Sequence, residues 1–401
     1  MALLPVADAL AMLLDGARPK SAESVGLHEA SGRVLSQDVV ARRTQPPFDT
    51  SAMDGYAVRA ADVAKVPVVL SLAGVAAAGA GYRGELRAGQ AVRIFTGAPL
   101  PTGADAIVIQ ENTRTPDPSA IEILEPSPPA KHIRRRGLDF AEGDTLLEAG
   151  RVLDPAALSL AAAGNHPALP VWRKPVVAII ATGDELRMPG DTPGPDEIIA
   201  SNTYGVAAIC AANGAEILDL GIAPDRAEAI SALARQALDR EAEVIVTLGG
   251  ASVGDHDLAQ DALAGLGMSL GFWKIAMRPG KPLMFGRLGA ARCLGLPGNP
   301  VSSLICSHLF LKPMVRALAG LPHADGEADA VLGADMGEND NRQDYVRATL
   351  AFVDGNRVAT PFPVQDSSML RTLAQANAAI IRAPHAASAR AGDPCRVLML
   401  R

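Results

Sequence analysis

Between residues 176 and 303, short apolar runs repeatedly end in loops that carry acids, bases or hydroxyls beside small residues. These loops hold Asp184 and Glu185, then Asp225, then Gly249, Gly250, Ser252, Asp255 and Asp257, then Lys274, Arg278 and Lys281, and finally Pro297, Gly298, Asn299 and Pro300. In an open parallel sheet, ligands bind beyond the carboxyl ends of the strands. Carboxylates beside cations can hold Mg²⁺ against a phosphate, while glycines let backbone N–H groups approach the phosphate oxygens. We therefore predict a phosphate-binding site that uses Mg²⁺ at one edge of a sheet.

Each of these residues also has a purely structural explanation. Asp225 could cap the helix predicted to follow it, and Asp184 or Glu185 could be first-turn acids favoured by a helix dipole. Lys274 and Lys281 could be surface lysines, and residues 297–300 could form only a tight turn. The coincidence of these side chains at one predicted edge favours a functional site.

Residues 250–254 also match the G-x-S-x-G nucleophile elbow of α/β-hydrolases, with Ser252 as the nucleophile. A catalytic triad would need a later acid and a later histidine. His308 falls inside a predicted helix, and His323 and His385 lie beyond the sheet region. Asp255 and Asp257 would also surround the nucleophile with negative charge, so the pattern disfavours a serine hydrolase.

The elements that position these loops alternate along the chain. Strands are predicted at 176–180, 216–221, 244–248 and 292–296, and helices at 202–213, 224–240, near 257–264 and at 301–318. This alternation predicts βαβ units and a mainly parallel sheet. Outside it, we predict helices at 5–16 and 154–164, a small β-rich domain over 60–130 and another over 324–401. The predicted fold class is α/β with several domains.

Two further motifs lie outside the sheet region. Residues 79–84 match G-x-G-x-x-G, but a turn and a strand are predicted after them, so we reject a dinucleotide site. Residues 131–139 form the densest basic run, which includes Arg134, Arg135 and Arg136. This run is either a solvated face or a clamp for an anionic ligand, because arginine can bind phosphate with two donors.

Composition narrows the class of protein. The chain has 401 residues, 48% of them hydrophobic and 20% charged, as in a globular protein of about two to four domains. A net charge of −7 gives no overall attraction to nucleic acid or to an anionic membrane. The four cysteines have no zinc spacing, the first residues lack a basic leader, and no apolar run is long enough to span a membrane. We therefore expect a cytoplasmic protein.

Taken together and in order, the motifs resemble those of the molybdopterin molybdenumtransferase family, which inserts the metal in molybdenum cofactor synthesis and is related to the C-terminal part of gephyrin. The resemblance rests on residues 182–186, on the run from Gly249 to Asp257, and on residues 278–282 and 296–300. It continues outside the sheet region through residues 51–57, 94–99 and 134–139. The resemblance thus covers essentially the whole chain.

The resemblance implies an elongated homodimer of four-domain subunits. The three-layer α/β/α sheet domain, of the molybdopterin-binding type, would be 174–323, and β-rich accessory domains would cover 45–139 and, as a barrel-like domain, 324–401. A discontinuous N-terminal domain would combine 1–44 with 140–173. The site would lie between the sheet domain of one subunit and N-terminal parts of the other.

The implied reaction takes adenylylated molybdopterin and molybdate, inserts molybdenum at the dithiolene and releases AMP, with Mg²⁺ required. By family position, Arg278, Lys281, Arg347 and Ser367 or Ser368 would bind molybdate. Asp184, Glu185, Asp225 and Asp257 would hold Mg²⁺ or orient water, with Lys274 as a further catalytic candidate. Gly249, Gly250 and Ser252 would bind the substrate, Pro297 and Pro300 would shape the floor, and Asp54, Thr96 and Asp139 would reach in from the N-terminal domains. Transient contacts with other proteins of cofactor synthesis are expected.

Arg278 departs from the lysine that many family members carry before Pro279, which keeps the charge but changes its geometry. The sequence disfavours two alternative functions. Adenylylation of molybdopterin would need only the sheet domain, so the long flanking regions argue against it. A non-catalytic dimeric scaffold would have no need of the acids and bases that the loops retain.

Overall fold

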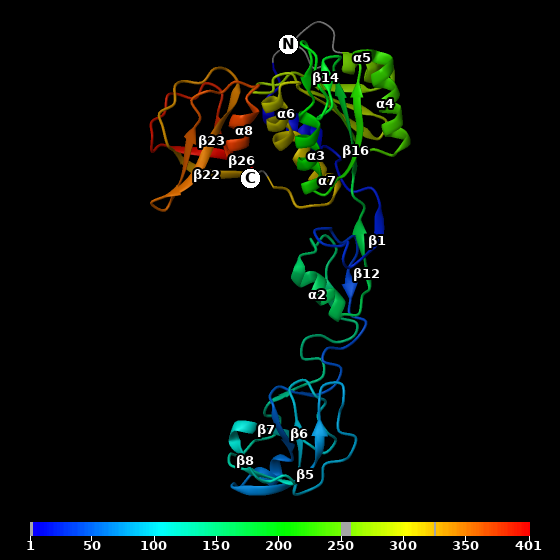
Figure 1. The fold of residues 1–401 in the computed structure, drawn as a ribbon, viewed down its shortest axis with the longest axis vertical. Coiled ribbons are helices and arrows are strands. Elements are labelled where there is room, and N and C mark those ends of the chain that lie inside the picture. The colour runs from blue at the N-terminus through cyan, green and yellow to red at the C-terminus, as the bar shows by residue number, and fades with distance from the viewer. Residues whose placement is uncertain (1–2, 250–257, 325) are drawn as a thin grey trace. The chain divides into compact units, whose positions relative to one another are not determined.

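The computed structural model describes residues 3–249, 258–324 and 326–401 (Figure 1). The chain separates into two compact units. The larger unit comprises Met1–Glu23, Gly32–Val34 and Val171–Arg401, and the smaller unit comprises Ser24–Ser31 and Leu35–Pro170. In the described ranges, no helix is both long and apolar enough to cross a membrane.

The larger unit contains a six-stranded sheet with the order β16-β13-β17-β21-β20-β18. Its strands are β13 (Val176–Thr182), β16 (Glu216–Ala223), β17 (Val244–Leu248), β18 (Ser269–Trp273), β20 (Met284–Leu288) and β21 (Ala291–Leu296). The first four strands in the spatial order are parallel, and β20 and β18 add an antiparallel pair at one edge. The predicted mainly parallel sheet is confirmed, but the antiparallel edge was not predicted.

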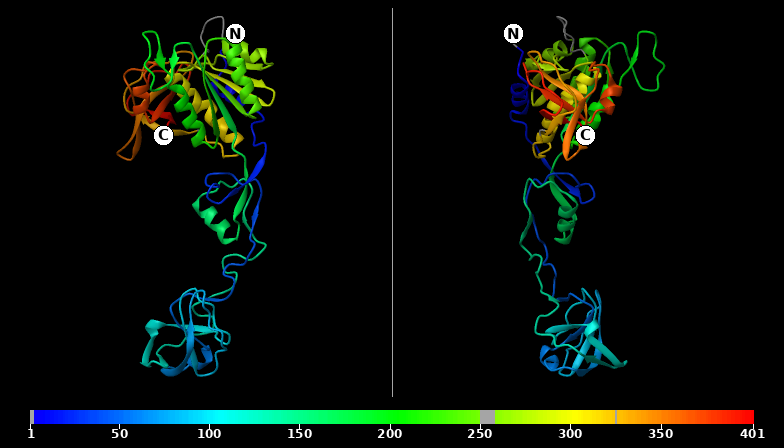
Figure 2. Two further views of the ribbon diagram at one scale, coloured as in Figure 1. Left: turned by 45° about the vertical axis from the view of Figure 1, so that its right-hand side comes forward. Right: turned by 90° about the vertical axis from the view of Figure 1, so that its left-hand side faces the viewer.

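Helices cover both faces of this sheet, which explains why the central strands are apolar throughout. In β13, Val177 and Ile179 point into one core, whereas Val176, Ala178 and Ile180 point into the other. Figures 1 and 2 show the two helical layers. One layer consists of α4 (Ala227–Asp239) and α5 (Leu258–Gly265), and the other of α1 (Val6–Leu14), α3 (Asn202–Ala212), α6 (Pro300–Cys306) and α7 (Lys312–Leu318).

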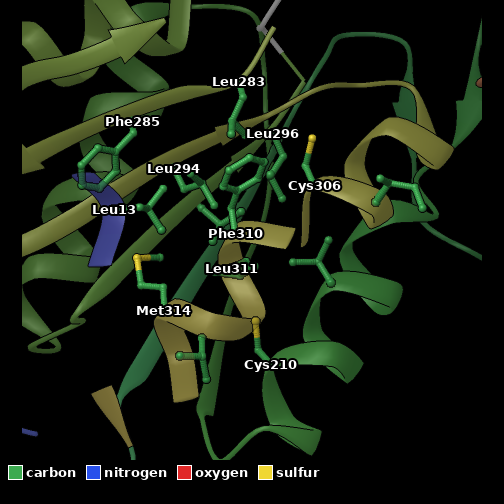
Figure 3. Packing of buried hydrophobic residues seen from close by; sticks show 14 of the residues in the cluster. Leu13, Cys210, Leu283, Phe285, Leu294, Leu296, Cys306, Phe310, Leu311 and Met314 are labelled. Carbon is green, nitrogen blue, oxygen red and sulfur yellow. The ribbon is translucent and has the colours of Figure 1, made fainter. Parts of the chain in front are cut away.

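The helical span predicted over 301–318 is present, but it is not a continuous α-helix. A π-helical turn, Ser307–Leu311, separates α6 from α7. Pro313 lies at the start of α7 and has no N–H to donate to the preceding turn, so a local change of helical register relieves the mismatch. Figure 3 shows Phe310 and Leu311 of this turn in the core, near Leu294 and Leu296 of β21.

The larger unit ends in a β-barrel, so the predicted β-rich C-terminal region is confirmed. Its strands are β22 (Glu327–Leu332), β23 (Gln343–Val353), β24 (Asn356–Pro361), β25 (Ala378–Arg382) and β26 (Pro394–Met399), and α8 (Leu370–Gln375) precedes β25. The order β23-β24-β22-β26-β25 closes because β25 also pairs with β23. A short strand from the sheet region, β19 (Met277–Arg278), joins β23 in parallel and ties the barrel to the sheet region.

The smaller unit holds a six-stranded mixed sheet with the order β7-β4-β6-β5-β9-β8, as the β-rich prediction requires. Its strands are β4 (Gly55–Val58), β5 (Val68–Ala76), β6 (Gln90–Ile94), β7 (Ala106–Ile109), β8 (Thr113–Asp117) and β9 (Ala120–Ile123). The predicted helix is α2 (Pro155–Ala163), capped by Asp154, whose Oδ1 accepts a 2.8 Å hydrogen bond from Ala157 N. Residues 79–84 lead into β6 rather than a helix, as predicted.

The remaining elements are short. They are β1 (Ala22–Gly26), β2 (Val39–Val40), β3 (Thr50–Ser51), β10 (Ile133–Arg134), β11 (Thr145–Leu147), β12 (Ala168–Trp172), β14 (Leu186–Arg187) and β15 (Ile198–Ile199), with 3₁₀ turns at Ala60–Val63 and Gln110–Asn112.

Candidate active site

A cavity of about 750 Å³ lies at the carboxyl edge of the parallel strands. Residues at or just after the ends of all four parallel strands line it: Thr182, Gly183 and Glu185 after β13, Asp225 after β16, Gly249 after β17, and Gly298, Asn299 and Pro300 after β21. We call it the strand-end cavity. Sequence-distant loops meet here because parallel strands end on one side of the sheet.

Glycines allow the loops of β13, β17 and β21 to approach one another. Gly249 has φ +98°, and a Cβ there would lie 2.6 Å from the carbonyl oxygen of Thr182. A Cβ on Gly298 would lie 3.6 Å from the Cα of Gly249. The floor of the cavity is therefore partly backbone, so a ligand can come close to the main chain there.

Three predicted carboxylates gather beside this floor. Glu185 and Asp225 line the cavity, and Asp225 N donates a 3.1 Å hydrogen bond to Asp184 Oδ1. Neither structural alternative applies to them. Glu185 is followed by β14 rather than a helix, and α4 begins after Arg226 with no side-chain cap from Asp225. Within the described residues, no three acids, histidines or cysteines form a ready-made metal cage.

Asn202, for which the sequence predicted no role, also lines the strand-end cavity. Its Nδ2 donates a 2.8 Å hydrogen bond to the carbonyl of Gly298 and so fixes the loop after β21. Asn202 is the first residue of α3. A polar residue at a helix start is normally attributed to capping, which is why this residue gave no separate signal.

A second cavity, of about 550 Å³, lies between residues 277–282 and the barrel. Arg278, Lys281, Arg347 and Ser367, all predicted to bind molybdate, line it, whereas Ser368 lines the strand-end cavity. We call it the barrel-side cavity. It brings together residues more than sixty positions apart because β19 pairs with the start of β23.

Arg347 is a buried cation whose hydrogen-bond partners are neutral. Its exposure is 1%, and its guanidinium donates only to Gln365 Oε1 at 3.2 Å and to the carbonyl of Met369 at 3.4 Å. No carboxylate of the described residues forms an ion pair with it, and burial lowers the pKa of Arg347 against the opposing effect of Asp366. A desolvated positive charge in a cavity wall is an anion-binding feature.

Arg278 is differently placed, because two carboxylates already bind its guanidinium. It forms ion pairs with Asp344 and, at 3.3 Å, with Asp340, and the hydrogen bond with Asp344 raises the pKa of Arg278. A planar guanidinium can span two carboxylates, which a lysine ammonium does less well. The ammonium of Lys281, in contrast, has no hydrogen-bond or ion-pair partner in the described part of the chain.

The two cavities share a wall made of two short segments. Pro300 lines one cavity and Ser302 the other, and the same is true of Ser368 and Ser367. Val301 N donates a 3.1 Å hydrogen bond to the carbonyl of Ser367, so the segments are joined directly. Ligands in the two cavities would therefore be close neighbours.

The other predicted residues of the larger unit lie outside both cavities. The Lys274 ammonium lies 4.0 Å from the centroid of the Trp273 ring. Pro297 is buried directly after β21. Gly250, Ser252, Asp255 and Asp257 lie outside the described residues, and so does the G-x-S-x-G match.

In the smaller unit, Asp54 and Thr96 are joined by hydrogen bonds. Asp54 Oδ1 accepts hydrogen bonds from Thr96 N at 2.8 Å and from Thr96 Oγ1 at 2.9 Å, and these bonds lower the pKa of Asp54. Asp139 is exposed. Within the basic run, Arg135 is held by Asp49 at 2.5 Å, whereas the exposed Arg134 forms no ion pair with the described residues.

Comparison with known proteins extends over the whole chain. Residues 4–164 match the family model for the MoeA N-terminal region (domain I and II), residues 178–317 that of a probable molybdopterin binding domain, and residues 329–400 that of the MoeA C-terminal region (domain IV). The crystal structure of the molybdopterin biosynthesis moea protein from Pyrococcus horikosii superposes with a TM-score of 0.83 at 28% identity, covering 100% of both chains.

Curated relatives agree with these matches. Molybdopterin molybdenumtransferase of Bacillus subtilis is 34% identical over 99% of this chain and 94% of its own length. Molybdopterin molybdenumtransferase 2 of Mycobacterium tuberculosis is 39% identical over 88% of this chain and 89% of its own. The resemblance inferred from the motifs is confirmed, and the chain belongs to the molybdopterin molybdenumtransferase family.

Proposed function

We propose that this protein inserts molybdenum from molybdate into adenylylated molybdopterin and releases AMP. The observation that carries the proposal is the shared wall between two unlike cavities. One has a glycine floor beside carboxylates, and the other contains the buried cation of Arg347. The relatives named as molybdopterin molybdenumtransferases support the same reaction.

In this proposal, the strand-end cavity holds the phosphates and the pterin of the substrate. Backbone N–H groups of the loops after β13, β17 and β21 would bind phosphate oxygens. The N–H groups of Gly183 and Gly249 are not among them, because they already donate 3.2 Å hydrogen bonds to the carbonyls of Ala223 and Leu296. The loop after β21 keeps its position because Asn202 holds the Gly298 carbonyl. Cleavage of the phosphoanhydride adds water to phosphorus and frees AMP.

The barrel-side cavity would hold molybdate, a small dianion. Arg347 supplies a fixed and desolvated charge, Lys281 an unpaired ammonium, and Ser367 a hydroxyl donor. Condensation of molybdate with the two dithiolene thiols forms two Mo–S bonds and releases one water, without a change of oxidation state. Arg278 acts mainly by holding β19 against the barrel, since Asp340 and Asp344 already neutralise it.

Mg²⁺ fits the donor set of the strand-end cavity. Asp184, Glu185 and Asp225, with Asp257 from outside the described residues, offer only oxygen ligands, and the described ones do not form a closed cage. That suits an ion that protein carboxylates and substrate phosphates hold jointly. When bound, Mg²⁺ would neutralise phosphate charge during AMP release. The carboxylates would also orient the attacking water.

We further propose that the working form is a cytoplasmic homodimer in which a second copy supplies Asp54, Thr96 and Asp139. The bonded Asp54–Thr96 pair supports this, because it presents a fixed and ionised carboxylate on the surface of the smaller unit.

The function is tested by incubating purified protein with adenylylated molybdopterin and measuring AMP. Release is expected only when molybdate and Mg²⁺ are both present, together with the formation of active cofactor. AMP release that ignores molybdate, or the absence of any release, would overturn the proposal.

A further inference from the structure

A third cavity lies at the opposite edge of the same sheet, where the parallel strands begin. It measures about 340 Å³ and is lined by Glu243, directly before β17, and by Ala290, directly before β21. It shares no lining residue with the strand-end or barrel-side cavity. Four cations contribute to its wall: Arg18, Lys20, Arg287 and Arg292. We call it the strand-start cavity.

Arg292 is the buried member of this group, with an exposure of 3%. Its Nη2 donates a 2.9 Å hydrogen bond to the carbonyl of Asp15, but its Nη1 is buried and has no hydrogen-bond partner among the described residues. Burial lowers the pKa of Arg292, and the neighbouring charge of Arg287 lowers it further. A guanidinium with an unused donor, removed from water, is costly unless an acceptor occupies the space beside it.

The carboxylates nearby are already engaged. Glu243 forms an ion pair with Arg173, which lies outside the lining, and accepts a 2.7 Å hydrogen bond from Val176 N. Asp15 reaches Arg287 at 3.4 Å through one carboxylate oxygen. In the described part of the chain, Arg18 and Lys20 form no ion pair. The cavity therefore has an excess of positive charge that the protein itself does not neutralise.

We propose that the strand-start cavity is a second anion site, separate from the active site, that binds a phosphate-class oxyanion, either inorganic or as a small phosphate monoester. Arginine donors in a fork suit paired phosphate oxygens, and two exposed cations at the rim suit the remaining charge. The cavity has room for on the order of ten water molecules, which is more than one tetrahedral oxyanion needs. This proposal is independent of the function proposed above.

Binding at this site would also act on the N-terminal helix. Arg287 and Arg292 both donate to the carbonyl of Asp15, the residue that ends α1, at 2.7 Å and 2.9 Å. Helix α1 places Ala9 and Leu13 in the main core of the sheet region, and Figure 3 shows Leu13 beside Leu294. An anion that orders the two arginines thus strengthens the attachment of α1. Amide hydrogen exchange in α1 should slow when the anion binds.

The test is calorimetric titration of the full-length protein with pyrophosphate, and with ribose 5-phosphate in a parallel arm. The variants are Arg292→Met and the doubly substituted Arg18→Gln/Lys20→Gln, in which both replaced side chains are exposed. Lys281→Gln is the matched control in the barrel-side cavity. We expect both strand-start variants to weaken binding at least about tenfold and the control to retain one site. Tighter binding of pyrophosphate would identify the natural ligand as an inorganic oxyanion, and tighter binding of ribose 5-phosphate would identify it as a phosphate monoester.

Three results would overturn the proposal: no binding of either probe, equal affinity in wild type and in Arg18→Gln/Lys20→Gln, or binding that only Lys281→Gln abolishes. The last result would assign the anion to the barrel-side cavity. Because the double variant has only exposed substitutions, it decides the question even if Arg292→Met fails to fold. AMP release should be the same in the double variant as in wild type, so failure here is distinguishable from failure of the proposed function.

Discussion

The backbone N–H of Val301 donates a 3.1 Å hydrogen bond to the carbonyl of Ser367, and this bond joins the first turn of α6 to the segment that precedes α8. The bond connects the sheet region to the C-terminal region at the point where the strand-end and barrel-side cavities meet. Because it uses only backbone atoms, the shared wall does not depend on the side chains that face either ligand. Substitutions in one cavity can therefore be made without losing the other.

Arg347→Met should abolish molybdate binding and leave the fold intact. The buried guanidinium has no ion pair among the described residues, so a side chain of similar size without charge removes a desolvation cost and leaves no carboxylate unpaired. Titration calorimetry should show at least about a hundredfold loss of molybdate affinity, since a charge-assisted contact in a desolvated site is lost.

The matched control for this variant is Arg357→Met in the same barrel, where the guanidinium lies 5.9 Å from the Phe352 ring and outside both cavities. Unchanged molybdate affinity in Arg347→Met would remove this residue from the oxyanion site.

Gly249→Ala should lower both stability and substrate binding. The residue has φ +98°, and its new Cβ would lie 2.6 Å from the Thr182 carbonyl oxygen, which is backbone and cannot move freely. The strain should cost about 2 kcal/mol or more in the free energy of unfolding, measured in urea. Gly265→Ala is the control, since that Cβ meets no described atom within 4 Å. Equal stability of the two variants would show that the loop after β17 is not confined as described.

Mixing two inactive variants should restore part of the activity if the site is completed across a dimer. Asp54→Ala removes the carboxylate of the smaller unit, and Lys281→Gln removes the ammonium of the barrel-side cavity. In a mixed dimer with twofold symmetry, one site combines both intact parts, so an equimolar mixture should recover about a quarter of wild-type AMP release. If AMP release by the mixture stays as low as that of the separate variants after subunit exchange, a site completed across the dimer is contradicted.

His308 should make the free energy of unfolding depend on pH between the ordinary histidine pKa of 6.5 and the lowered pKa of about 4. Burial, and then the charge of Lys312, lower the pKa of His308 to about 4 from 6.5, so the unfolded chain takes up the proton first. The free energy of unfolding should fall by about 3 kcal/mol as the pH drops from 6.5 to 4, and this contribution should not change further at lower pH.

His308→Leu should lack this component when urea unfolding is followed across the same range, with the exposed His28→Leu as the matched control. Parallel pH profiles of wild type and His308→Leu would rule out a buried neutral histidine.

Short stretches of sequence were enough to predict strands that are apolar on both faces and helices that begin with a capping residue. The strand at Val176–Thr182 is one example, and α2 with its Asp154 cap is another. In contrast, β18 includes Gly271 and has exposed residues along most of its length, so nothing in its composition marks a sheet edge. The π-helical turn before Pro313 was not predicted either, because a proline in a helical pattern can also end or kink a helix and does not by itself indicate a π-helical turn.

The same distinction applies to the site. The residues that follow the parallel strands could be assigned to one site from the sequence, because the carboxyl ends of parallel strands lie at the same edge of the sheet. The sequence could not predict that Arg347 forms no ion pair among the described residues, or that Arg278 pairs with Asp344. The ion pair of Arg278 depends on the pairing of β19 with β23, and the partners of Arg347 come from Gln365 and Met369, so both join segments that are apart in the chain. No periodicity encodes that pairing.

We propose that molybdate and the adenylylated substrate occupy separate cavities on either side of the Val301–Ser367 hydrogen bond. The most direct measurement is a crystal structure with molybdate and AMP, using anomalous scattering at the molybdenum edge. Molybdenum should lie in the barrel-side cavity within contact of Arg347 and Lys281, with AMP in the strand-end cavity beside Gly249 and Asn299. Molybdenum in any other place, or both ligands in a single cavity, would contradict the account.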